Sequence, residues 1–290
     1  MVQRCQPCAP LPLMPSPEPG PCYVVASAPA TLITMKPQPP HRPHHREPAE
    51  DGPVRLFGVH AVEAALRNPA RQIERLMVTD NAEHRLEEAL QARKAKAQRV
   101  TPRDLDRLLG ADTVHQGVCL ETQALLEPEL EDVARRAQEA GPIVVLDQIT
   151  DPQNVGAILR TAAAFNASGL IITRRHSPPL SGTLAKSASG ALEFVPVVLV
   201  ANLARTMGEL QEKGVRRLGL SGDGPTSLEG EALTGALALV LGAEGKGLRR
   251  LTRDLCDAVC RIDIEAAIGS LNVSNAAAIA LHLIAMRRRA

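Results

Sequence analysis

The second half of the chain alternates between short continuous apolar runs and segments in which apolar residues recur with helical spacing. A continuous apolar run predicts a strand buried on both faces, and helical spacing predicts a helix with one apolar stripe. Their alternation predicts an α/β domain with a mostly parallel sheet covered by helices on both sides. The expected strands are 143–147, 170–173, 195–200, 217–221, 237–242 and 258–262, and the expected helices are 155–165, 203–212, 248–256 and 271–287.

A smaller α/β unit precedes this domain. Val59, Val62 and Leu66 share one stripe of a predicted helix. The expected helices are 57–66, 82–97 and 102–109, and the expected strands are 73–79 and 117–121. Segment 127–140 is expected to hold a linker and a connecting helix. These patterns predict three consecutive parts after the N-terminal region, namely a small domain over 54–126, a linker over 127–141 and the larger domain over 142–290.

Residues 1–53 differ from the rest because they hold 14 of the 23 prolines. Proline has no backbone N–H to donate to a helix or sheet, so we expect a disordered extension. Met35 is an alternative start of the protein. The segment does not resemble a targeting peptide well, since prolines interrupt the apolar stretch that such a peptide requires. Cys5 and Cys8, with nearby histidines, allow a metal or redox site, but their spacing fits no compact zinc pattern and we expect no bound metal. Cys119, Cys256 and Cys260 lie in apolar runs and are expected to be small core residues.

Composition excludes several classes of protein. The chain has 33 basic and 32 acidic residues and a net charge of +1, so it carries no strongly basic coat, and we expect no DNA partner. With no Trp, one Tyr and three Phe, base stacking on aromatic platforms is almost excluded. No apolar run reaches the roughly 18 residues of a membrane span. A local cluster of Arg93, Lys94, Lys96 and Arg99 is either a solvated helix face or an RNA-backbone contact.

The loops after strands matter most, because ligands of parallel sheets gather beyond the carboxyl ends of the strands. In the first such loop, Asp151 and Pro152 make a turn and a helix opens near Asn154. Helix entries offer unpaired N–H groups that suit phosphate. Arg160 rises from a face of small residues and could present its planar fork of donors to a polyanion. Taken alone, the pattern favours an arginine on an exposed helix, surrounded by alanines of high helix propensity.

The second loop follows the strand at 237–242 and holds Gly242, Gly245 and Gly247. It matches neither the phosphate loop of triphosphatases nor the dinucleotide glycine pattern, which removes the main support for those two classes. Glu244, within this turn, either orients a hydroxyl or amine of a substrate or caps the next helix. The glycines permit a ligand to touch the backbone.

The third loop follows the strand at 258–262. Ser270 is placed to cap the last helix, which is dense in alanine and therefore permits close backbone approach. Asn272 and Ser274 either belong to a site or satisfy only backbone groups.

Together, the three loops resemble the signature motifs of the SpoU/TrmH RNA 2′-O-ribose methyltransferases. The matching motifs are Asp151-Pro152-x-Asn154-x-Gly156-Ala157-x-x-Arg160-Thr161-Ala162, Leu241-Gly242-x-Glu244-x-x-Gly247 and Ser270-Leu271-Asn272-Val273-Ser274-x-Ala276. The resemblance spans 55 to the C-terminus and is greatest to the branch that methylates a guanosine of 23S rRNA. The chain has Asn166 where the family commonly has glycine, and Glu265-Ala266-Ala267-Ile268 in place of a proline-containing run.

This resemblance implies a trefoil-knotted, mostly parallel sheet in the larger domain. It also implies a small N-terminal α/β domain like a ribosomal-protein-type RNA-binding module. It implies S-adenosylmethionine bound in a bent shape within the knot, a homodimer in which each active site borrows from the partner, an RNA substrate and a cytoplasmic protein. Membranes and DNA are not expected partners.

The resemblance also implies site residues. Arg160, Asn154, Glu244, Ser270 and Asn272 would form the catalytic cluster, and Gly242, Ile262 and Leu271 would contact the cofactor, largely through backbone atoms. Family proposals make the arginine at position 160 the base. Because a guanidinium is a poor base in proteins, we favour Arg160 as the residue that grips phosphate and stabilises developing alkoxide charge.

Two other functions fit parts of the same pattern. One is a sister 2′-O-methyltransferase that acts on tRNA or on another rRNA site, since the motifs are shared. The other is a catalytically silent RNA-binding or ribosome-assembly factor, against which the intact Arg160, Glu244 and Asn272 argue.

Overall fold

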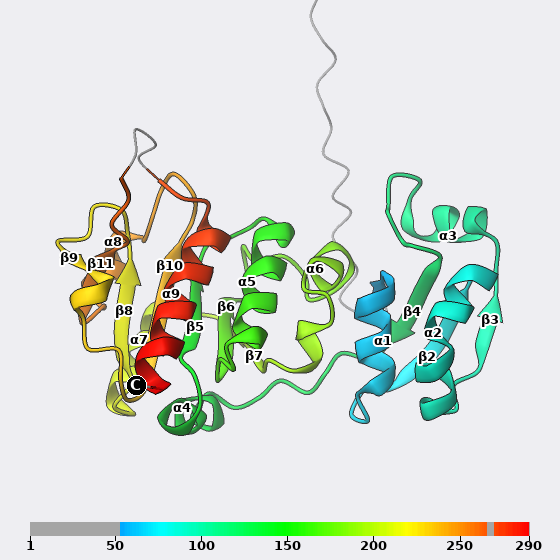
Figure 1. The fold of residues 1–290 in the computed structure, drawn as a ribbon, viewed down its shortest axis with the longest axis horizontal. Coiled ribbons are helices and arrows are strands. Elements are labelled where there is room, and N and C mark those ends of the chain that lie inside the picture. Colours follow the sequence, from blue (N-terminus) through cyan, green and yellow to red (C-terminus); the bar gives the residue numbers. More distant parts are fainter. Residues whose placement is uncertain (1–52, 266–269, 290) are drawn as a thin grey trace, which may run out of the picture. The chain divides into compact units, whose positions relative to one another are not determined.

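The computed structural model describes residues 53–265 and 270–289 (Figure 1). Cys5, Cys8 and the alternative start at Met35 lie outside the described residues, as does the predicted disordered extension over 1–53 except for Pro53. The segment Ala266-Ala267-Ile268 also lies outside them.

The smaller unit is a four-stranded sheet with three helices. Its elements are β1 (Val54–Phe57), α1 (Val59–Arg67), β2 (Ile73–Val78), α2 (Asp80–Arg93), β3 (Ala97–Arg99), α3 (Pro102–Leu109) and β4 (Val118–Thr122). The strand order is β1-β4-β2-β3, in which β4 runs antiparallel to both neighbours and β3 runs parallel to β2. Val59, Val62 and Leu66 are buried on one side of α1, so the predicted apolar stripe is confirmed.

Two of the differences between this unit and the sequence-based expectation have clear local causes. Helix α1 begins two residues later than expected, because Gly58 has a φ of 89° that no helix residue adopts. Helix α2 ends at Arg93, well before the expected end at 97, because Lys94 adopts a left-handed conformation and the chain then forms β3.

The larger unit contains seven strands and their covering helices. Its elements are α4 (Leu130–Glu139), β5 (Ile143–Asp147), α5 (Pro152–Ala164), β6 (Gly169–Thr173), α6 (Gly182–Ser187), η1 (Ala191–Glu193), β7 (Val197–Val200), α7 (Leu203–Glu212), β8 (Arg216–Leu220), β9 (Thr226–Ser227), η2 (Leu228–Gly230), β10 (Leu237–Gly242), α8 (Arg250–Asp254), β11 (Ala258–Arg261) and α9 (Val273–Arg289). The strand order is β7-β6-β5-β10-β8-β11-β9, and every pairing between neighbours is parallel. The predicted parallel sheet is confirmed.

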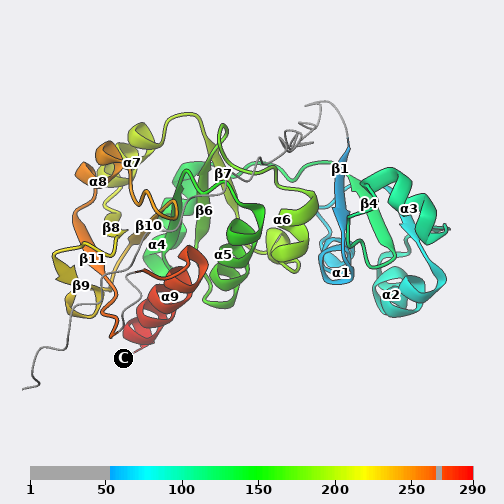
Figure 2. The ribbon, with the colours of Figure 1, turned by 90° about the horizontal axis from the view of Figure 1, so that it is seen from above.

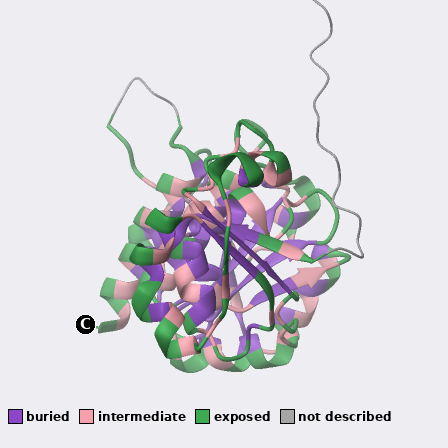
Figure 3. Ribbon diagram, turned by 90° about the vertical axis from the view of Figure 1, so that its right-hand side faces the viewer, coloured by how far each residue is buried: buried purple, intermediate pink, exposed green. Residues whose placement is uncertain are grey.

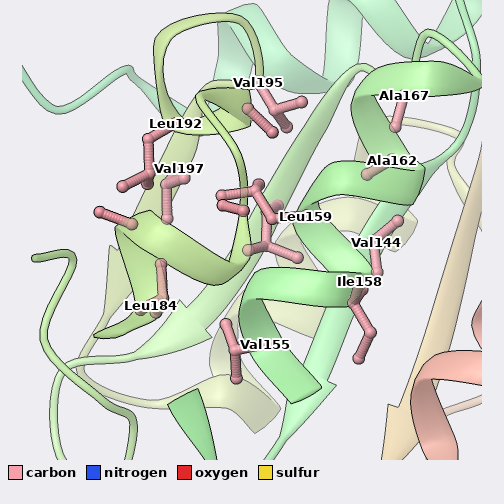
Figure 4. Close-up of a cluster of buried hydrophobic side chains, with 14 of the residues drawn as sticks. Val144, Val155, Ile158, Leu159, Ala162, Ala167, Leu184, Leu192, Val195 and Val197 are labelled. Carbon is pink, nitrogen blue, oxygen red and sulfur yellow. The ribbon is translucent and has the colours of Figure 1, made fainter. Parts of the chain in front are cut away.

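Helices cover both faces of this sheet, as Figure 2 shows for α5 and α9 on one side and α7 on the other. Alternate residues of β5 face opposite ways: Val144 and Leu146 join the core under α5 and α9, whereas Ile143 and Val145 join the core under α4 and α7. The central strands β5, β6 and β10 are therefore buried on both faces (Figure 3). Figure 4 shows Ile158 and other α5 side chains packed in the first of these cores.

Helix α5 is held closely against α6. A Cβ atom at Gly156 would lie 2.7 Å from the Leu184 carbonyl oxygen, so only glycine fits at this contact. Ser187 Oγ donates a hydrogen bond of 3.0 Å to the Gln153 carbonyl oxygen. At the other end of α5, Asn166 adopts a φ of 53°, and asparagine tolerates this left-handed conformation almost as glycine does. Asn166 therefore suits this turn.

An ion pair between the buried Arg217 and the partly exposed Asp257 joins the starts of β8 and β11. Arg217 is 3% exposed, and the Asp257 carboxylate accepts hydrogen bonds from its Nε (2.9 Å), its Nη2 (2.6 Å) and its backbone N–H (2.7 Å). The hydrogen bonds from Arg217 hold the pKa of Asp257 below its usual value. The folded state therefore favours the ionised carboxylate.

We expect Asp257→Asn to destabilise the fold by about 2 kcal/mol at neutral pH, because it leaves the buried Arg217 charge without a counter-charge. A lowered pKa contributes stability above the unfolded pKa of about 4 and loses it as pH falls through the folded pKa. The difference between the variant and the unsubstituted protein, measured by urea unfolding, should therefore shrink below about pH 4. A constant difference across this range would contradict the ionic role.

Candidate functional site

A cavity opens at the carboxyl ends of the central strands, where the loops after β8, β10 and β11 meet the start of α9. Its volume is about 840 Å³, within the range of roughly 300–1,000 Å³ typical of small-molecule sites. The lining segments are 220–223, 241–248, 261–264 and 270–273, with Arg253 and Ala276. Six residues expected in the site from the sequence line this cavity, namely Gly242, Glu244, Ile262, Ser270, Leu271 and Asn272.

Three side chains from distant parts of the chain form one hydrogen-bonded cluster at this cavity. Asn272 Nδ2 donates to Glu244 Oε1 at 2.6 Å and to Asn154 Oδ1 at 3.0 Å. Asn154 Nδ2 donates to the same Glu244 oxygen at 3.2 Å. The three loops are thus joined by direct contacts between their polar side chains.

Glu244 is the hub of this cluster. Its Oε1 also accepts the backbone N–H of Val273 at 3.3 Å, so three donors share one carboxylate oxygen. Among the described residues, Glu244 Oε2 has no hydrogen-bond partner, and the side chain is exposed. The second oxygen is therefore free to accept a hydrogen bond from a bound molecule.

The start of α9 differs from the expectation that Ser270 caps it. The helix begins at Val273, and Asn272 Oδ1 accepts the backbone N–H of Ser274 at 2.9 Å and that of Asn275 at 3.4 Å. Asn272 is therefore the capping residue, since its acceptor satisfies the free N–H groups of the first turn. Ser270 is exposed and lines the cavity, which leaves its hydroxyl available to a ligand.

Asn154 is positioned by the first turn of α5. Asp151 caps this helix by accepting the Gln153 N–H at 3.0 Å, and Pro152 occupies the first turn, so the helix starts slightly earlier than the expected residue 155. The side chain of Asn154 is half-buried and turned to Glu244.

Arg160 stands apart from this cluster. It lies on α5 six residues after Asn154, which is about 9 Å of helical rise at 1.5 Å per residue. Its side chain is exposed, and within residues 53–265 and 270–289 it has no hydrogen-bond or ion-pair partner. Of the eight residues expected from the sequence, Arg160 alone neither lines the cavity nor hydrogen-bonds to a residue that does.

The glycines of the second loop allow its tight turn. Gly245 and Gly247 have φ values of 74° and 64°, and Gly247 N–H donates to the Ala243 carbonyl at 2.8 Å. A Cβ atom at Gly242 would lie 2.2 Å from the Gly247 carbonyl carbon. The backbone of this loop therefore folds back on itself at the cavity wall, where no side chain can intervene.

The loop after β8 also lines the cavity, and sequence reasoning did not single it out. Its signal was present, because Ser221-Gly222-Asp223-Gly224 follows an expected strand as the other loops do. Arg253 Nη1 donates to Asp223 at 2.9 Å, and this bond, with a weaker contribution from Ser221, lowers the pKa of Asp223. This wall of the cavity carries a fixed ion pair.

The described cysteines are unsuited to nucleophilic or metal chemistry. Burial raises the pKa of Cys119 to about 11 and that of Cys256 to about 12, so both thiols stay protonated at neutral pH. In the described part of the chain, no three His, Cys, Asp or Glu side chains are grouped as a metal site requires. The same residues contain no helix that combines the length and apolar character needed to cross a bilayer.

Comparison with family models gives two adjacent matches. Residues 141–282 match the SpoU rRNA Methylase family, and residues 55–128 match the model described as RNA 2′-O ribose methyltransferase substrate binding.

Solved structures with the same fold include two methyltransferases. The SpoU methyltransferase AviRb from Streptomyces viridochromogenes, in complex with AdoMet, has a TM-score of 0.71 at 23% identity and covers 82% of this chain and 91% of its own. An AdoMet-bound rRNA methyltransferase from Sinorhizobium meliloti has a TM-score of 0.67 at 23% identity, and the match covers 80% of this chain and 86% of that protein's chain. The expected trefoil-knotted α/β fold, preceded by a small α/β domain, is confirmed.

Curated relatives are similar at the level of sequence. The 23S rRNA (guanosine-2′-O-)-methyltransferase RlmB of Ralstonia nicotianae is 40% identical over 230 residues, which are 78% of this chain and 92% of the relative. RlmB of Vibrio vulnificus is 40% identical over 235 residues, 78% of this chain and 94% of the relative. Because relatives this similar align over nearly their whole length, the chain belongs to the SpoU rRNA methylase family.

Proposed function

We propose that this protein transfers a methyl group from S-adenosylmethionine to the ribose 2′-hydroxyl of a guanosine in 23S rRNA. The observation that carries the proposal is the Asn154–Glu244–Asn272 cluster at the cavity, in a chain whose relatives are named for this reaction. In this proposal residues 54–126 form the substrate domain, 127–141 the linker and 142–290 the methyltransferase domain, consistent with the two family matches. A substrate of this kind also implies a cytoplasmic protein.

The cavity suits S-adenosylmethionine in size and in chemistry. Its volume of about 840 Å³ exceeds what a nucleoside with an amino-acid tail requires. Ile262 and Leu271 offer apolar surface to a base, and the glycine-containing turn after Gly242 offers backbone N–H and C=O groups at close range. Bound there, the cofactor supplies a methyl group already activated by its sulfonium.

The protein's residues then have to align one ribose hydroxyl and help remove its proton. Alignment of two reactants alone can lower a barrier by about 7–11 kcal/mol. The free Oε2 of Glu244 and the Ser270 hydroxyl are placed to hold the nucleoside, and Asn154 and Asn272 fix the orientation of Glu244. Arg160 grips the adjacent phosphate through its planar fork of donors and stabilises the developing alkoxide.

The isolated position of Arg160 favours a dimer in which this residue serves the partner's site. Helix α9 packs on α5, the helix of Arg160, and presents Ile279 and Met286 to solvent at 44% and 52% exposure. Apolar side chains at these positions suit contact with a second copy of the chain.

Mixing two inactive variants tests this arrangement. If Arg160 acts in the partner's site, a mixed dimer of Arg160→Ala and Glu244→Ala subunits contains one site with both native residues. Random pairing should then restore about one quarter of the native activity. If each site uses its own Arg160, mixing should restore none. Light scattering on the unmixed protein checks the dimer itself.

The proposed substrate is tested by mapping ribose methylation on 23S rRNA and tRNA, nucleotide by nucleotide, from cells with and without the protein. We expect one 23S guanosine to lose its 2′-O-methyl group when the protein is absent. Loss of a tRNA methyl group instead would establish the sister activity. Calorimetry with S-adenosylmethionine separates both from a silent RNA-binding factor, which would not bind it.

Gly242→Ala is expected to abolish measurable S-adenosylmethionine binding. The new methyl group would meet Gly247 and Leu248 backbone atoms at 2.2–2.4 Å, so the cavity wall must move. Calorimetry measures the loss, and Gly208→Ala is the matched control because its Cβ meets nothing within 4 Å. Native affinity in Gly242→Ala would show that this wall does not contact the cofactor.

A further inference from the structure

Asp147 is a buried carboxylate that the proposed reaction does not use. It is the last residue of β5, and its side chain is 0% exposed. In the parallel ladder it lies opposite Gly242, the last residue of β10. A buried charge is costly unless it is paired, so its partner identifies what the residue holds in place.

The partner is Arg249, which follows the second loop and directly precedes α8. Arg249 Nε donates to Asp147 Oδ1 at 2.6 Å, and the Arg249 backbone N–H donates to Oδ2 at 3.0 Å. One carboxylate thus binds both the side chain and the backbone of the same residue. This fixes the position of the main chain at Arg249 and not only that of its charge.

These contacts tie both ends of the loop over 243–248 to one point. The loop begins beside Asp147 through the strand pairing of Gly242 and ends at Asp147 through Arg249. Between these ends lie Glu244, the hub of the side-chain cluster, and two glycines of positive φ that give the loop little stiffness of its own.

We propose that the Asp147–Arg249 pair is a positioning clamp that sets the loop carrying Glu244 and the cofactor wall. The clamp rests on the proposed function for its catalytic consequence, but its effect on the loop does not depend on it. Charge-assisted hydrogen bonds of this length are strong, and the pair is shielded from water on the Asp147 side. Without it, the loop is attached to β5 at one end only.

Arg249→Gln tests the clamp, because Arg249 is 48% exposed and its loss leaves no cavity in the core. The variant also removes the counter-charge of the buried Asp147 and should therefore be less stable, so circular dichroism first checks that it is folded. We expect about tenfold weaker S-adenosylmethionine binding, about tenfold lower kcat at saturating cofactor, and an unchanged KM for RNA. Amide hydrogen exchange of a peptide spanning 243–249 should be at least about tenfold faster. Arg249→Lys, which keeps the charge, should recover part of the affinity.

Arg250→Gln is the matched control, since this neighbouring arginine is 94% exposed and only 3.8 Å from Asp254. It should leave exchange, affinity and kcat unchanged. Asp147→Asn should reproduce the Arg249→Gln effects if it folds, and if it does not, Arg249→Gln decides alone.

Native exchange and affinity in Arg249→Gln would overturn the clamp. A lower melting temperature with unchanged kcat and cofactor affinity would also overturn it, because it would show a purely structural pair. If the unsubstituted protein binds no S-adenosylmethionine, the proposed function fails, and the exchange rate of the 243–249 peptide still tests the clamp separately.

Discussion

Arg160→Ala is expected to lower kcat for RNA methylation at least about a thousandfold and to leave S-adenosylmethionine affinity unchanged. Removing one preorganised group that stabilises developing charge typically costs about 10²–10³ in rate, and Arg160 in our proposal also holds the phosphate. The cofactor affinity should not change because Arg160 does not line the cavity. Single-turnover methylation of transcribed rRNA measures the rate, and calorimetry measures the affinity.

Arg160→Lys separates the two roles considered for this residue. If Arg160 stabilises charge, lysine at this position supplies the same charge without the planar fork of donors. Part of the activity should then remain, with an unchanged pH profile. A base replaced by lysine should shift the pH dependence towards the lower pKa of an ammonium. Arg205→Ala, on the exposed face of α7, is the matched control and should be fully active. Near-normal turnover in either Arg160 variant would remove both roles.

The layers of the fold could be predicted from sequence because they depend on local patterns. Continuous apolar runs such as 143–146 specify a strand buried on both faces wherever it lies in the sheet. The strands β1, β3 and β9 and the six-residue helix α6 were not predicted, since segments this short show no periodicity. The placement of β10 between β5 and β8 depends on long-range pairing that no local pattern records.

In the candidate site, too, local features could be predicted from the sequence and long-range contacts could not. The motifs identified Asn154, Glu244 and Asn272 one loop at a time, but their shared hydrogen bonds join positions 90 and 118 residues apart. Asp147 was visible only as the end of a strand, because its partner Arg249 lies 102 residues away. Ser270 was expected as a helix cap, and Asn272 takes that place because it stands directly before the first helical residue. The sequence therefore indicated which polar residues each loop contributes, but not which of two neighbouring residues caps the helix.

Glu244→Ala is expected to lower kcat by about 10²–10³, the usual cost of removing a positioned hydrogen-bonding group from an active site. The substitution should lower the rate by disrupting the whole cluster, because Asn154 and Asn272 both donate to Glu244 and lose their common acceptor together. In a double-mutant cycle with Asn272→Ala, the two losses should therefore be far from additive, since residues acting as one unit share a single contribution. Glu209→Gln, on the exposed face of α7, controls for the loss of one surface carboxylate. Strictly additive losses would show that Glu244 and Asn272 contact the substrate independently and that the hydrogen bonds between them do not matter to the rate.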